Sequence, residues 1–300
     1  MTIKIPITFL GTSQAVPTAK RNHTSILLEY NGENILIDCG EGTQRQFRKA
    51  KLNPCRLTKL LITHWHGDHI LGIPGLLQTL ALNNYSRTLE VYLPKGTKHY
   101  MDLMYRLFVF KEKIKMNIHE VDSGKILETK EFIIISEKMD HDTPCNAYSF
   151  IIKEKLRIKK DKLKKLKLKG PIISQLAQGK DIVVNGKKIK SKDMTYLQEG
   201  KKITFILDTK INSNCYKIAE NSDLLISEAV YMKQDAELSS ERKHLTAEQA
   251  AEIAKKSKSQ KLVLTHLSQR YDGREKFLLA EAKKKFKNTI LAEDLLRIEV

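Results

Sequence analysis

The 300-residue sequence lacks the features that mark several specialised protein classes. Its four cysteines, Cys39, Cys55, Cys145 and Cys215, are far apart and form no C-x-x-C pair. This argues against a disulfide scaffold and a cysteine-based zinc site, and it favours a reducing compartment. Apolar runs such as 261–264 are far shorter than the roughly 20 residues of a membrane-spanning helix. The N-terminus has no apolar signal core, so we expect no export signal, no membrane partner and a cytoplasmic location.

Acidic residues are scarce relative to basic ones. The chain has 35 Asp and Glu against 53 Lys and Arg, a formal net charge of +18. Charge does not determine the fold, but this excess predicts a polyanionic partner or an anionic surface. Segment 153–202 contains 17 Lys or Arg and 5 Asp or Glu, so it carries +12 of that charge. On charge alone, this segment is either a solvated lysine-rich surface or a binding arm inserted into the core.

Hydrophobic patterns outside that segment alternate between strand and helix. Asn31-Gly32 separates the apolar runs 26–30 and 34–37, and this turn pair predicts a β-hairpin. Helical spacing predicts a helix over 70–83, and Thr246 with Gln249 matches a capping box that opens another over 246–256. Similar patterns predict strands at 90–93, 132–135, 148–152, 203–207, 224–227, 262–265 and 295–298, and helices at 161–168, 215–221 and 274–287. This alternation predicts a layered α/β core.

The segment Thr63-His64-Trp65-His66-Gly67-Asp68-His69 is the strongest chemical motif. It follows an apolar strand, and side chains alternate along a strand, so His64 and His66 would point to the same side. Imidazole nitrogen and carboxylate oxygen are ligands that zinc prefers. Four such groups within six residues are too many for one open catalytic ion, so we expect two metals. Chance clustering of surface histidines is the much weaker interpretation.

Further ligands are expected where other strands end. His141, Asp208 and His266 each follow an apolar strand pattern, as a site at one edge of a sheet requires. Judged alone, each of the three is more often an ordinary polar residue. His99 and His119 lack this context, and we expect them to be ordinary surface residues.

The His-x-His-x-Asp-His segment, with Asp38 before it and His141, Asp208 and His266 after it, resembles the metallo-β-lactamase superfamily. Within it, the chain resembles ribonuclease Z, the tRNA 3′-processing endonuclease, in its short form. Gly11-Thr12-Ser13, the run from Asp38 to Gln44, and His244-Leu245-Thr246-Ala247 carry this similarity together with the basic segment. The resemblance implies an αββα four-layer sandwich, with residues 1–152 and 203–300 as the catalytic core and 153–202 as an inserted tRNA-binding arm.

The resemblance also implies a role for individual residues. One zinc would be held by His64, His66 and His141, and the other by Asp68, His69 and His266, with Asp208 bridging both. Asp38 would orient ligands from behind. Asp68 would accept the proton of the attacking water, and His244, oriented by Glu228, would donate one. The acceptor end of the RNA would meet Arg21 and Asn22, and the arm would grip it through Gly170, Pro171, Lys164, Lys165 and Lys167.

These roles imply removal of the 3′ trailer from precursor tRNA by a homodimer, with a 3′-hydroxyl left on the tRNA and a 5′-phosphate on the trailer. Two alternatives stay open on the sequence. Another two-zinc hydrolase of the same fold would act on small phosphodiesters, sulfates or thioesters and would not need the arm. A non-catalytic RNA-binding protein with structural zinc would not need Asp68.

Overall fold

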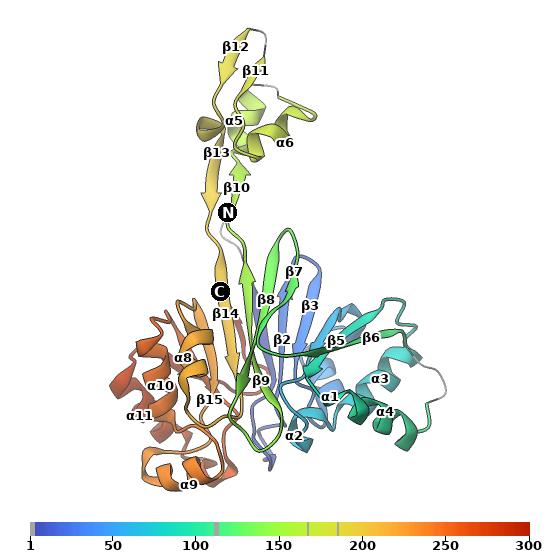
Figure 1. Cartoon of the computed structure of the whole chain (residues 1–300), viewed down its shortest axis with the longest axis vertical. Coiled ribbons are helices and arrows are strands. Elements are labelled where there is room, and N and C mark those ends of the chain that lie inside the picture. The colour runs from blue at the N-terminus through green and yellow to red at the C-terminus, as the bar shows by residue number, and fades with distance from the viewer. Residues whose placement is uncertain (1–3, 111–113, 167, 185) are drawn as a thin grey trace.

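Two β-sheets lie face to face between outer layers of helices, and a long arm rises from one end of this core (Figure 1). The computed structural model describes residues 4–110, 114–166, 168–184 and 186–300, and within these ranges each of the two sheets has seven strands. The expected four-layer arrangement is therefore confirmed. No helix in these ranges is both long enough and apolar enough to span a bilayer.

The first sheet is formed by the N-terminal part of the chain and the last strand. Its order is β18-β1-β2-β3-β4-β5-β6, in which β3 to β6 are parallel. The predicted Asn31-Gly32 turn joins β2 to β3, with both residues at positive φ (45° and 83°). The bounds are β1 Pro6–Gly11, β2 Ser25–Tyr30, β3 Glu33–Ile37, β4 Lys59–Leu61, β5 Leu89–Pro94, β6 Met116–Val121 and β18 Arg297–Glu299.

The second sheet contains the central and C-terminal strands in the order β17-β16-β15-β14-β9-β8-β7. Strands β14 to β17 are parallel, while β9 pairs antiparallel with β14. The bounds are β7 Gly124–Glu128, β8 Phe132–Met139, β9 Cys145–Ile152, β14 Lys201–Ile206, β15 Leu224–Glu228, β16 Leu262–Thr265 and β17 Thr289–Leu291.

The main hydrophobic core lies between the two sheets. Phe9, Ile26 and Ile37 of the first sheet pack in one buried cluster with Phe150 and Phe205 of the second. A second buried cluster joins the first sheet to its outer helices, and a third joins the second sheet to its own. The first sheet is covered by α1 Thr43–Lys49, α3 Ile73–Leu82 and α4 Lys98–Leu107, and the second by α8 Ser213–Ala219, α10 Ala247–Lys256 and α11 Glu275–Lys285.

Short helical turns connect the strands and helices of these layers. They are η1 Pro54–Arg56, α2 Gly67–Ile70, η2 Lys233–Asp235, α9 Ala236–Glu241 and η3 Gln269–Tyr271. The predicted helix over 70–83 is in fact two helices, α2 and α3. Gly72, between the two helices, packs against the backbone of the segment after β3.

The arm leaves the core after β9 and returns at β14. A two-stranded stalk of β10 Lys155–Ile158 and β13 Thr195–Gln198 carries a small tip (Figure 1). Leu168, Leu176, Ile182 and Met194 give the tip its own buried cluster. The tip contains α5 Lys160–Lys165, α6 Ile172–Ala177, β11 Ile182–Val184, β12 Lys187–Ile189 and α7 Ser191–Met194. The helix predicted over 161–168 is the shorter α5, and the strands of the arm were not predicted.

Candidate metal centre

The histidine-rich segment follows β4 and reaches α2 at the edge of the sheets opposite the arm (Figure 1). It is held against the segment that follows β3, because the Cys39 N–H donates to the His69 carbonyl at 2.8 Å. The two segments touch so closely that a Cβ at Gly40 would lie 2.4 Å from the Asp68 carbonyl oxygen. A Cβ at Gly72 would lie 2.0 Å from the Gly40 carbonyl oxygen. Glycine is therefore required at both positions.

Two groups of potential ligands lie side by side and share one carboxylate. The ligand atoms of the first group, His64, His66, His141 and Asp208, all lie within 4.8 Å of one another. His66 Nδ1 is 3.2 Å from His141 Nε2, and His64 Nε2 is 3.5 Å from Asp208 Oδ2. Three different segments of the chain thus converge on this group.

The second group consists of Asp68, His69, His266 and again Asp208. His69 Nε2 lies 3.3 Å from Asp68 Oδ2, and His266 Nε2 lies 2.9 Å from Asp208 Oδ1. The first group faces Oδ2 of Asp208, whereas His69 and His266 are closest to Oδ1. Asp208 is therefore placed to offer one oxygen to each group.

These spacings are close to those between the ligand atoms of a metal ion. Tetrahedral zinc with ligands at about 2.0–2.1 Å separates its ligand atoms by about 3.3 Å, close to the separations above. His64 Nε2, His69 Nε2, His266 Nε2 and Asp208 Oδ1 are buried and have no hydrogen-bond partner among the described residues. Because an unpaired buried polar atom is costly, four of them converging indicate a place for metal ions.

Two of the histidines are held from behind by Asp38 and Thr63. Asp38 is fully buried and accepts from His69 Nδ1 at 2.6 Å. It also accepts from the Thr63 hydroxyl at 2.7 Å, which leaves the Thr63 oxygen to accept from His64 Nδ1 at 3.0 Å. These contacts keep Nε2 of both rings free for a metal, which is the arrangement that raises ligand basicity in known metal sites.

Two further histidines, His141 and His266, are held in the same way by different groups. The Lys243 carbonyl accepts from His141 Nδ1 at 3.1 Å. Thr24 donates to the Ser13 carbonyl, so its oxygen accepts from His266 Nδ1 at 2.6 Å. Of the groups that orient ligands, only Asp38 was predicted from the sequence.

Three residues of the site have left-handed backbone conformations. Asp38 (φ 55°), Asp208 (φ 46°) and His266 (φ 55°) each follow the end of a strand. Positive φ is unfavourable for residues with a Cβ and persists where the surroundings impose it, often at functional sites. It turns each side chain out of its strand at the edge where the two sheets meet.

Buried negative charge gives the site its electrostatic character. Burial raises the pKa of Asp208, but the neighbouring His266, His69 and His64 outweigh it and hold this pKa well below its usual value. Burial lowers the pKa of His69, yet the carboxylates of Asp68, Asp208 and Asp38 raise it well above normal. Three buried carboxylates thus favour a positive charge between them, and a metal ion supplies one.

His244 and Glu228 lie directly beside the metal centre. Glu228 is fully buried; its Oε2 is 3.1 Å from His244 Nδ1, and its Oε1 accepts from the Thr209 N–H at 2.7 Å. Burial lowers the pKa of His244, but Glu228 and Asp208 raise it to about 9. His244 Nδ1 is also 3.9 Å from Asp208 Oδ2, so this imidazole adjoins both ligand groups.

The residues predicted to bind substrate differ in how the structure places them. Arg21 is buried: its guanidinium donates to the Thr12 hydroxyl at 2.8 Å and the Ala292 carbonyl at 2.7 Å. This side chain holds its loop in place, and its contact with substrate stays a prediction. The Asn22 side chain donates to the Glu41 carbonyl.

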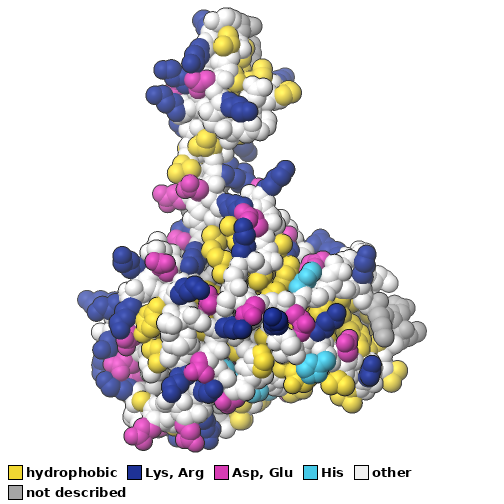
Figure 2. All heavy atoms as spheres, in the orientation of Figure 1, with side chains coloured by type: hydrophobic (Ala, Val, Ile, Leu, Met, Phe, Trp, Pro, Cys, Tyr) yellow, Lys and Arg dark blue, Asp and Glu magenta, His cyan; other side chains and the backbone are white. Residues whose placement is uncertain are grey.

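The predicted arm contacts are exposed. Lys164 and Lys165 lie on α5, and Gly170, at φ 77°, precedes Pro171 at the start of α6. Lys167 lies outside the described residues. Lys and Arg side chains spread over the arm and far outnumber its acidic ones, as Figure 2 shows.

Comparison with known proteins agrees with this geometry. A family model described as Anti-Pycsar protein Apyc1 matches residues 5–178, so this part of the chain belongs to that sequence family. A metallo-β-lactamase fold protein from Bacillus subtilis superposes with a TM-score of 0.71, covering 99% of this chain and 100% of that one at 20% identity, which shows the fold.

Full-length similarity to ribonuclease Z extends through the arm. Human tRNase Z, short form, superposes with a TM-score of 0.70 at 26% identity, covering 98% of each chain. Ribonuclease Z of Methanothermobacter thermautotrophicus is 37% identical over 296 residues, covering 98% of this chain and 96% of that protein. The chain therefore belongs to the ribonuclease Z family of the metallo-β-lactamase fold.

Proposed function

We propose that this protein is a zinc-dependent endoribonuclease that removes the 3′ trailer from precursor tRNA. The products are a tRNA with a 3′-hydroxyl and a trailer with a 5′-phosphate. One observation carries the proposal: two ligand groups share Asp208 and lie next to the His244–Glu228 pair. This combination suits phosphodiester hydrolysis, in which charge is neutralised at phosphorus while protons move at two oxygens.

Two zinc ions, one for each ligand group, would stabilise charge on the phosphate and make water a stronger nucleophile at neutral pH. His64, His66 and His141 would hold one, Asp68, His69 and His266 the other, and Asp208 both. The unpartnered nitrogens and the spacings near 3.3 Å support this assignment.

The chain's own groups move the protons. Asp68 is the proton acceptor: burial raises its pKa, but His69 and His266 outweigh this and keep it ionised. His244 is the proton donor to the departing ribose 3′-oxygen, a poor leaving group that needs a proton. Glu228 fixes one nitrogen of this ring, which leaves the other for the substrate.

Positive charge near the metal centre and on the arm supports an RNA substrate. A cavity of about 350 Å³ lies between the loop after β1 and the turn after His266, and it is lined by Gln14, Arg242, Ser268 and Arg270 among others. It is large enough for part of a nucleotide. The arm presents further cations for phosphates at a distance from the reaction, and A-form RNA is bound mainly through phosphates and shape.

We also propose that the enzyme acts as a homodimer. The arm and Asp208 lie at opposite ends of β14, whose six residues span about 20 Å. The arm points away from the edge that carries the metal centre (Figure 1). A second copy would supply an arm directed toward this site.

The decisive experiment is incubation of the purified, zinc-loaded protein with a trailer-bearing precursor tRNA, followed by mapping of both product ends. We expect one cut that leaves the 3′-hydroxyl and the 5′-phosphate. Asp68→Ala should lower the rate of cleavage by at least about 10²–10⁴-fold, the effect of losing an acid–base group. Its circular dichroism spectrum should be unchanged. His119→Ala, a substitution of a half-buried histidine paired with Glu90, is the matched control. Full activity of Asp68→Ala would contradict the assignment and support a structural zinc.

Shortening the arm separates this function from a small-molecule hydrolase. The stalk ends at the pair Ile158 with Thr195, so residues 160–193 can be replaced by a glycine-rich turn without breaking the pairing. We expect precursor tRNA cleavage to fall and hydrolysis of a small chromogenic phosphodiester to persist. Unchanged tRNA cleavage would refute the role of the arm.

A further inference from the structure

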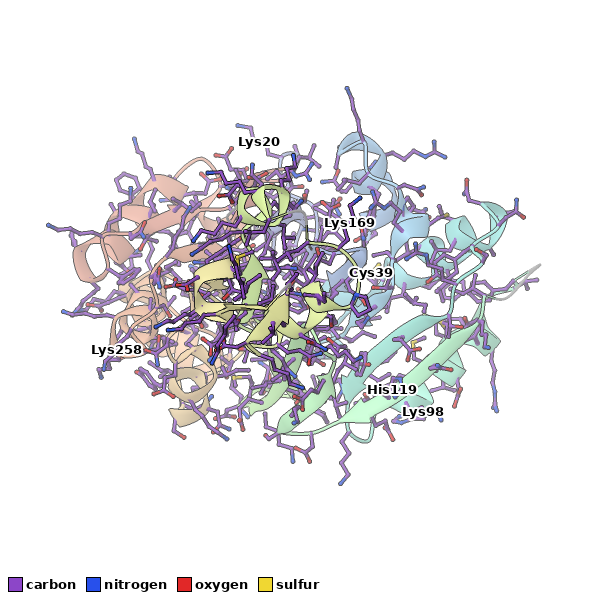
Figure 3. All side chains as sticks on the ribbon, turned by 90° about the horizontal axis from the view of Figure 1, so that it is seen from above. Lys20, Cys39, Lys98, His119, Lys169 and Lys258 are labelled. Carbon is purple, nitrogen blue, oxygen red and sulfur yellow. The ribbon has the colours of Figure 1, made fainter. Side chains whose placement is uncertain are left out.

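The chain between β1 and β2 forms one wall of the cavity that adjoins the turn after His266. We call residues 12–24 the β1 loop. The loop residues that line this cavity, of about 350 Å³, are Gln14, Ala15 and Val16. The loop also reaches the surface: Figure 3 shows Lys20 at the outer side of the molecule, away from Lys98 and Lys258. A strand of RNA that enters the metal centre from this side would pass along the β1 loop.

Asp294 closes the base of the β1 loop. Its Oδ1 accepts from the Thr12 hydroxyl at 2.8 Å, and its Oδ2 accepts from the Asn22 N–H at 2.7 Å. Thr12 begins the loop, and Asn22 lies near its end. The N–H groups of Thr12 and Ser13 both donate to the Asn22 carbonyl at 2.9 Å, so the two ends are adjacent. One carboxylate thus fixes both ends of the loop at a single point.

Asp294 is itself fixed to both sheets. It follows β17, and the N–H of Ala292 between them donates to the Leu264 carbonyl of β16 at 2.8 Å. Gln46 of α1 donates from Nε2 to Asp294 Oδ2 at 2.8 Å and to the Leu10 carbonyl of β1 at 2.6 Å. The carboxylate therefore joins the β1 loop to strands of the first and the second sheet.

A buried cation supports the charge of Asp294. Arg21 Nη1 donates to the Thr12 hydroxyl oxygen at 2.8 Å, one hydrogen bond away from the carboxylate. Burial raises the pKa of Asp294 above its ordinary value, and the hydrogen bonds from Asn22 and Thr12 oppose this rise. A charge in such a place costs free energy unless it is hydrogen-bonded. Two of its three donors belong to the β1 loop, so the loop and the carboxylate stabilise each other.

The neighbouring carboxylate lacks these bonds. Glu293 is exposed, and its side chain makes no hydrogen bond or ion pair within the described ranges. It lines the same cavity of about 740 Å³ as Asp294. The two acids thus share charge and surroundings but differ in their contact with the β1 loop, which makes Glu293 a matched control.

The support of His266 does not pass through Asp294. Thr24, which accepts from His266 Nδ1, has contacts of its own. Its hydroxyl donates to the Ser13 carbonyl at 2.9 Å, and its carbonyl accepts from the Gly40 N–H at 3.0 Å. Asp294 makes no hydrogen bond or ion pair with a candidate metal ligand among the described residues. Loosening the loop at Asp294 should therefore leave the metal ligands in place.

We infer that Asp294 is a positioning residue for RNA cleavage, which holds the β1 loop in place against the substrate. The inference rests on the proposed function, to which it adds a carboxylate that touches neither the metal ligands nor the reacting atoms. The loop would contact the RNA in the ground state and in the transition state alike. Loss of such contacts raises KM and leaves kcat nearly unchanged.

The test is steady-state cleavage of precursor tRNA by the full-length, zinc-saturated protein. For Asp294→Ala we expect KM to rise at least about tenfold, the effect of one lost hydrogen-bonded contact, with kcat little changed. Asp294→Asn keeps an oxygen for the Asn22 N–H and should recover most of this loss. Glu293→Ala should behave as the wild type. Hydrolysis of a small chromogenic phosphodiester, which does not extend to the loop, should be the same in all of these proteins.

Zinc affinity, measured by competition with a chromogenic chelator, separates positioning of the substrate from support of the metal. Asp294→Ala should bind zinc as the wild type does. Thr24→Val removes the acceptor for His266 Nδ1, so we expect it to lower zinc affinity about 10- to 100-fold and to slow hydrolysis of both substrates. If Asp294→Ala shows the same pattern as Thr24→Val, Asp294 supports the metal centre or the fold, and the inference is wrong.

A double-mutant cycle tests the route through Thr12. Thr12→Val keeps the shape of the side chain and removes the hydroxyl that donates to Asp294. This variant also carries the test if urea denaturation shows that Asp294→Ala folds poorly, and its KM should rise in the same direction. Because the two residues act on the loop together, the combined change in log KM should be smaller than the sum of the separate changes. Additive changes would contradict the inference.

The wild type separates this inference from the proposed function. A wild type that cuts no precursor tRNA would overturn both. A wild type that cuts precursor tRNA, while Asp294→Ala cuts it with the same KM, would overturn the role of Asp294 alone.

Discussion

His141 is held in place by Lys243, a residue type that gives no sign of this role in the sequence. Lys243 accepts from His141 Nδ1 through its carbonyl, and its ammonium lies 3.1 Å from Asp140 Oδ1 and 3.3 Å from the His141 carbonyl. Its backbone is left-handed, at φ 50°. This lysine therefore fastens the loop that carries a metal ligand to the loop that carries His244.

Lys243→Met should loosen the loop of His141 while leaving every ligand in place. Loss of a group that orients a ligand typically weakens metal binding 10- to 100-fold, and we expect a decrease of about this size in zinc affinity. Competition with a chromogenic chelator measures it without substrate. Lys243→Arg should retain most of the affinity, and Lys258→Met, far from the site, all of it. An unchanged affinity in Lys243→Met would leave Lys243 without a positioning role.

His244→Ala tests proton donation at the leaving oxygen. We expect kcat to fall by about 10²–10⁴-fold on a normal precursor tRNA. A substrate with sulfur in place of the bridging 3′-oxygen has a leaving group that needs no proton, so the loss on it should be small. Equal losses on both substrates would show that His244 only positions the phosphate.

At the scale of single residues, the sequence pointed to the clustered His and Asp side chains better than to the groups that support them. The four candidate ligands from His64 to His69 are visible because they are close in sequence and follow a strand. Thr24 and Lys243 reach the site only through the fold, from segments that carry no motif. The contacts of Arg21 could not be predicted because they are with Glu275 and Ala292, which follow it by more than 250 residues.

Among the elements, α10 shows how a local signal serves the site. Thr246 accepts from the Gln249 N–H at 3.2 Å, and the Gln249 side chain accepts from the Thr246 N–H at 2.9 Å, as the capping box predicted. Thr246 also pairs with Tyr231 in an isolated bridge. The cap thus fixes the end of the loop that carries His244.

Thr246→Ala removes the side-chain half of this cap. We expect the free energy of unfolding to fall by about 1 kcal/mol, measured by urea denaturation of the zinc-loaded protein. Thr246→Ser keeps the hydroxyl and should restore most of the stability. If Thr246→Ala lowers the free energy of unfolding no more than Thr246→Ser does, the cap contributes little to stability.

Elements with strong periodicity were predicted, whereas those decided by tertiary contact were not. The hairpin at Asn31-Gly32 and the parallel strands β14 to β16 follow from local patterns. The strands of the arm were missed because lysines interrupt them, and their apolar residues bury themselves in the small cluster of the arm tip. Helix α4 was missed for a similar reason, since its apolar residues point both inward and outward.

Over the whole molecule, charge is concentrated at the end remote from the reaction. The arm segment holds +12 of the net +18. Contacts between the arm and phosphates would therefore supply binding energy far from the bond that is cut. This arrangement suits a substrate with a long folded body.

Precursor tRNA affinity should fall steeply with salt. If the arm neutralises six to ten phosphates, affinity falls roughly 10³–10⁵-fold between 50 and 200 mM salt on the scale of duplex DNA. Lys164→Met with Lys165→Met should lower the slope of log affinity against log salt by about two, measured by filter binding. Lys258→Met serves as the control outside the arm. A slope that is unaffected by the arm lysines would place the phosphate contacts on the core.

The point where the arm enters the core has a consequence for how such enzymes diversify. Strands β9 and β14 pair directly, from Ile152 with Lys201 to Tyr148 with Phe205, so the sheet is closed whatever lies between them. His141 and Asp208 lie beyond the other ends of β8 and β14. A lineage can therefore lengthen, shorten or exchange the inserted segment without displacing a ligand. The choice of RNA and the chemistry of cleavage are free to evolve separately.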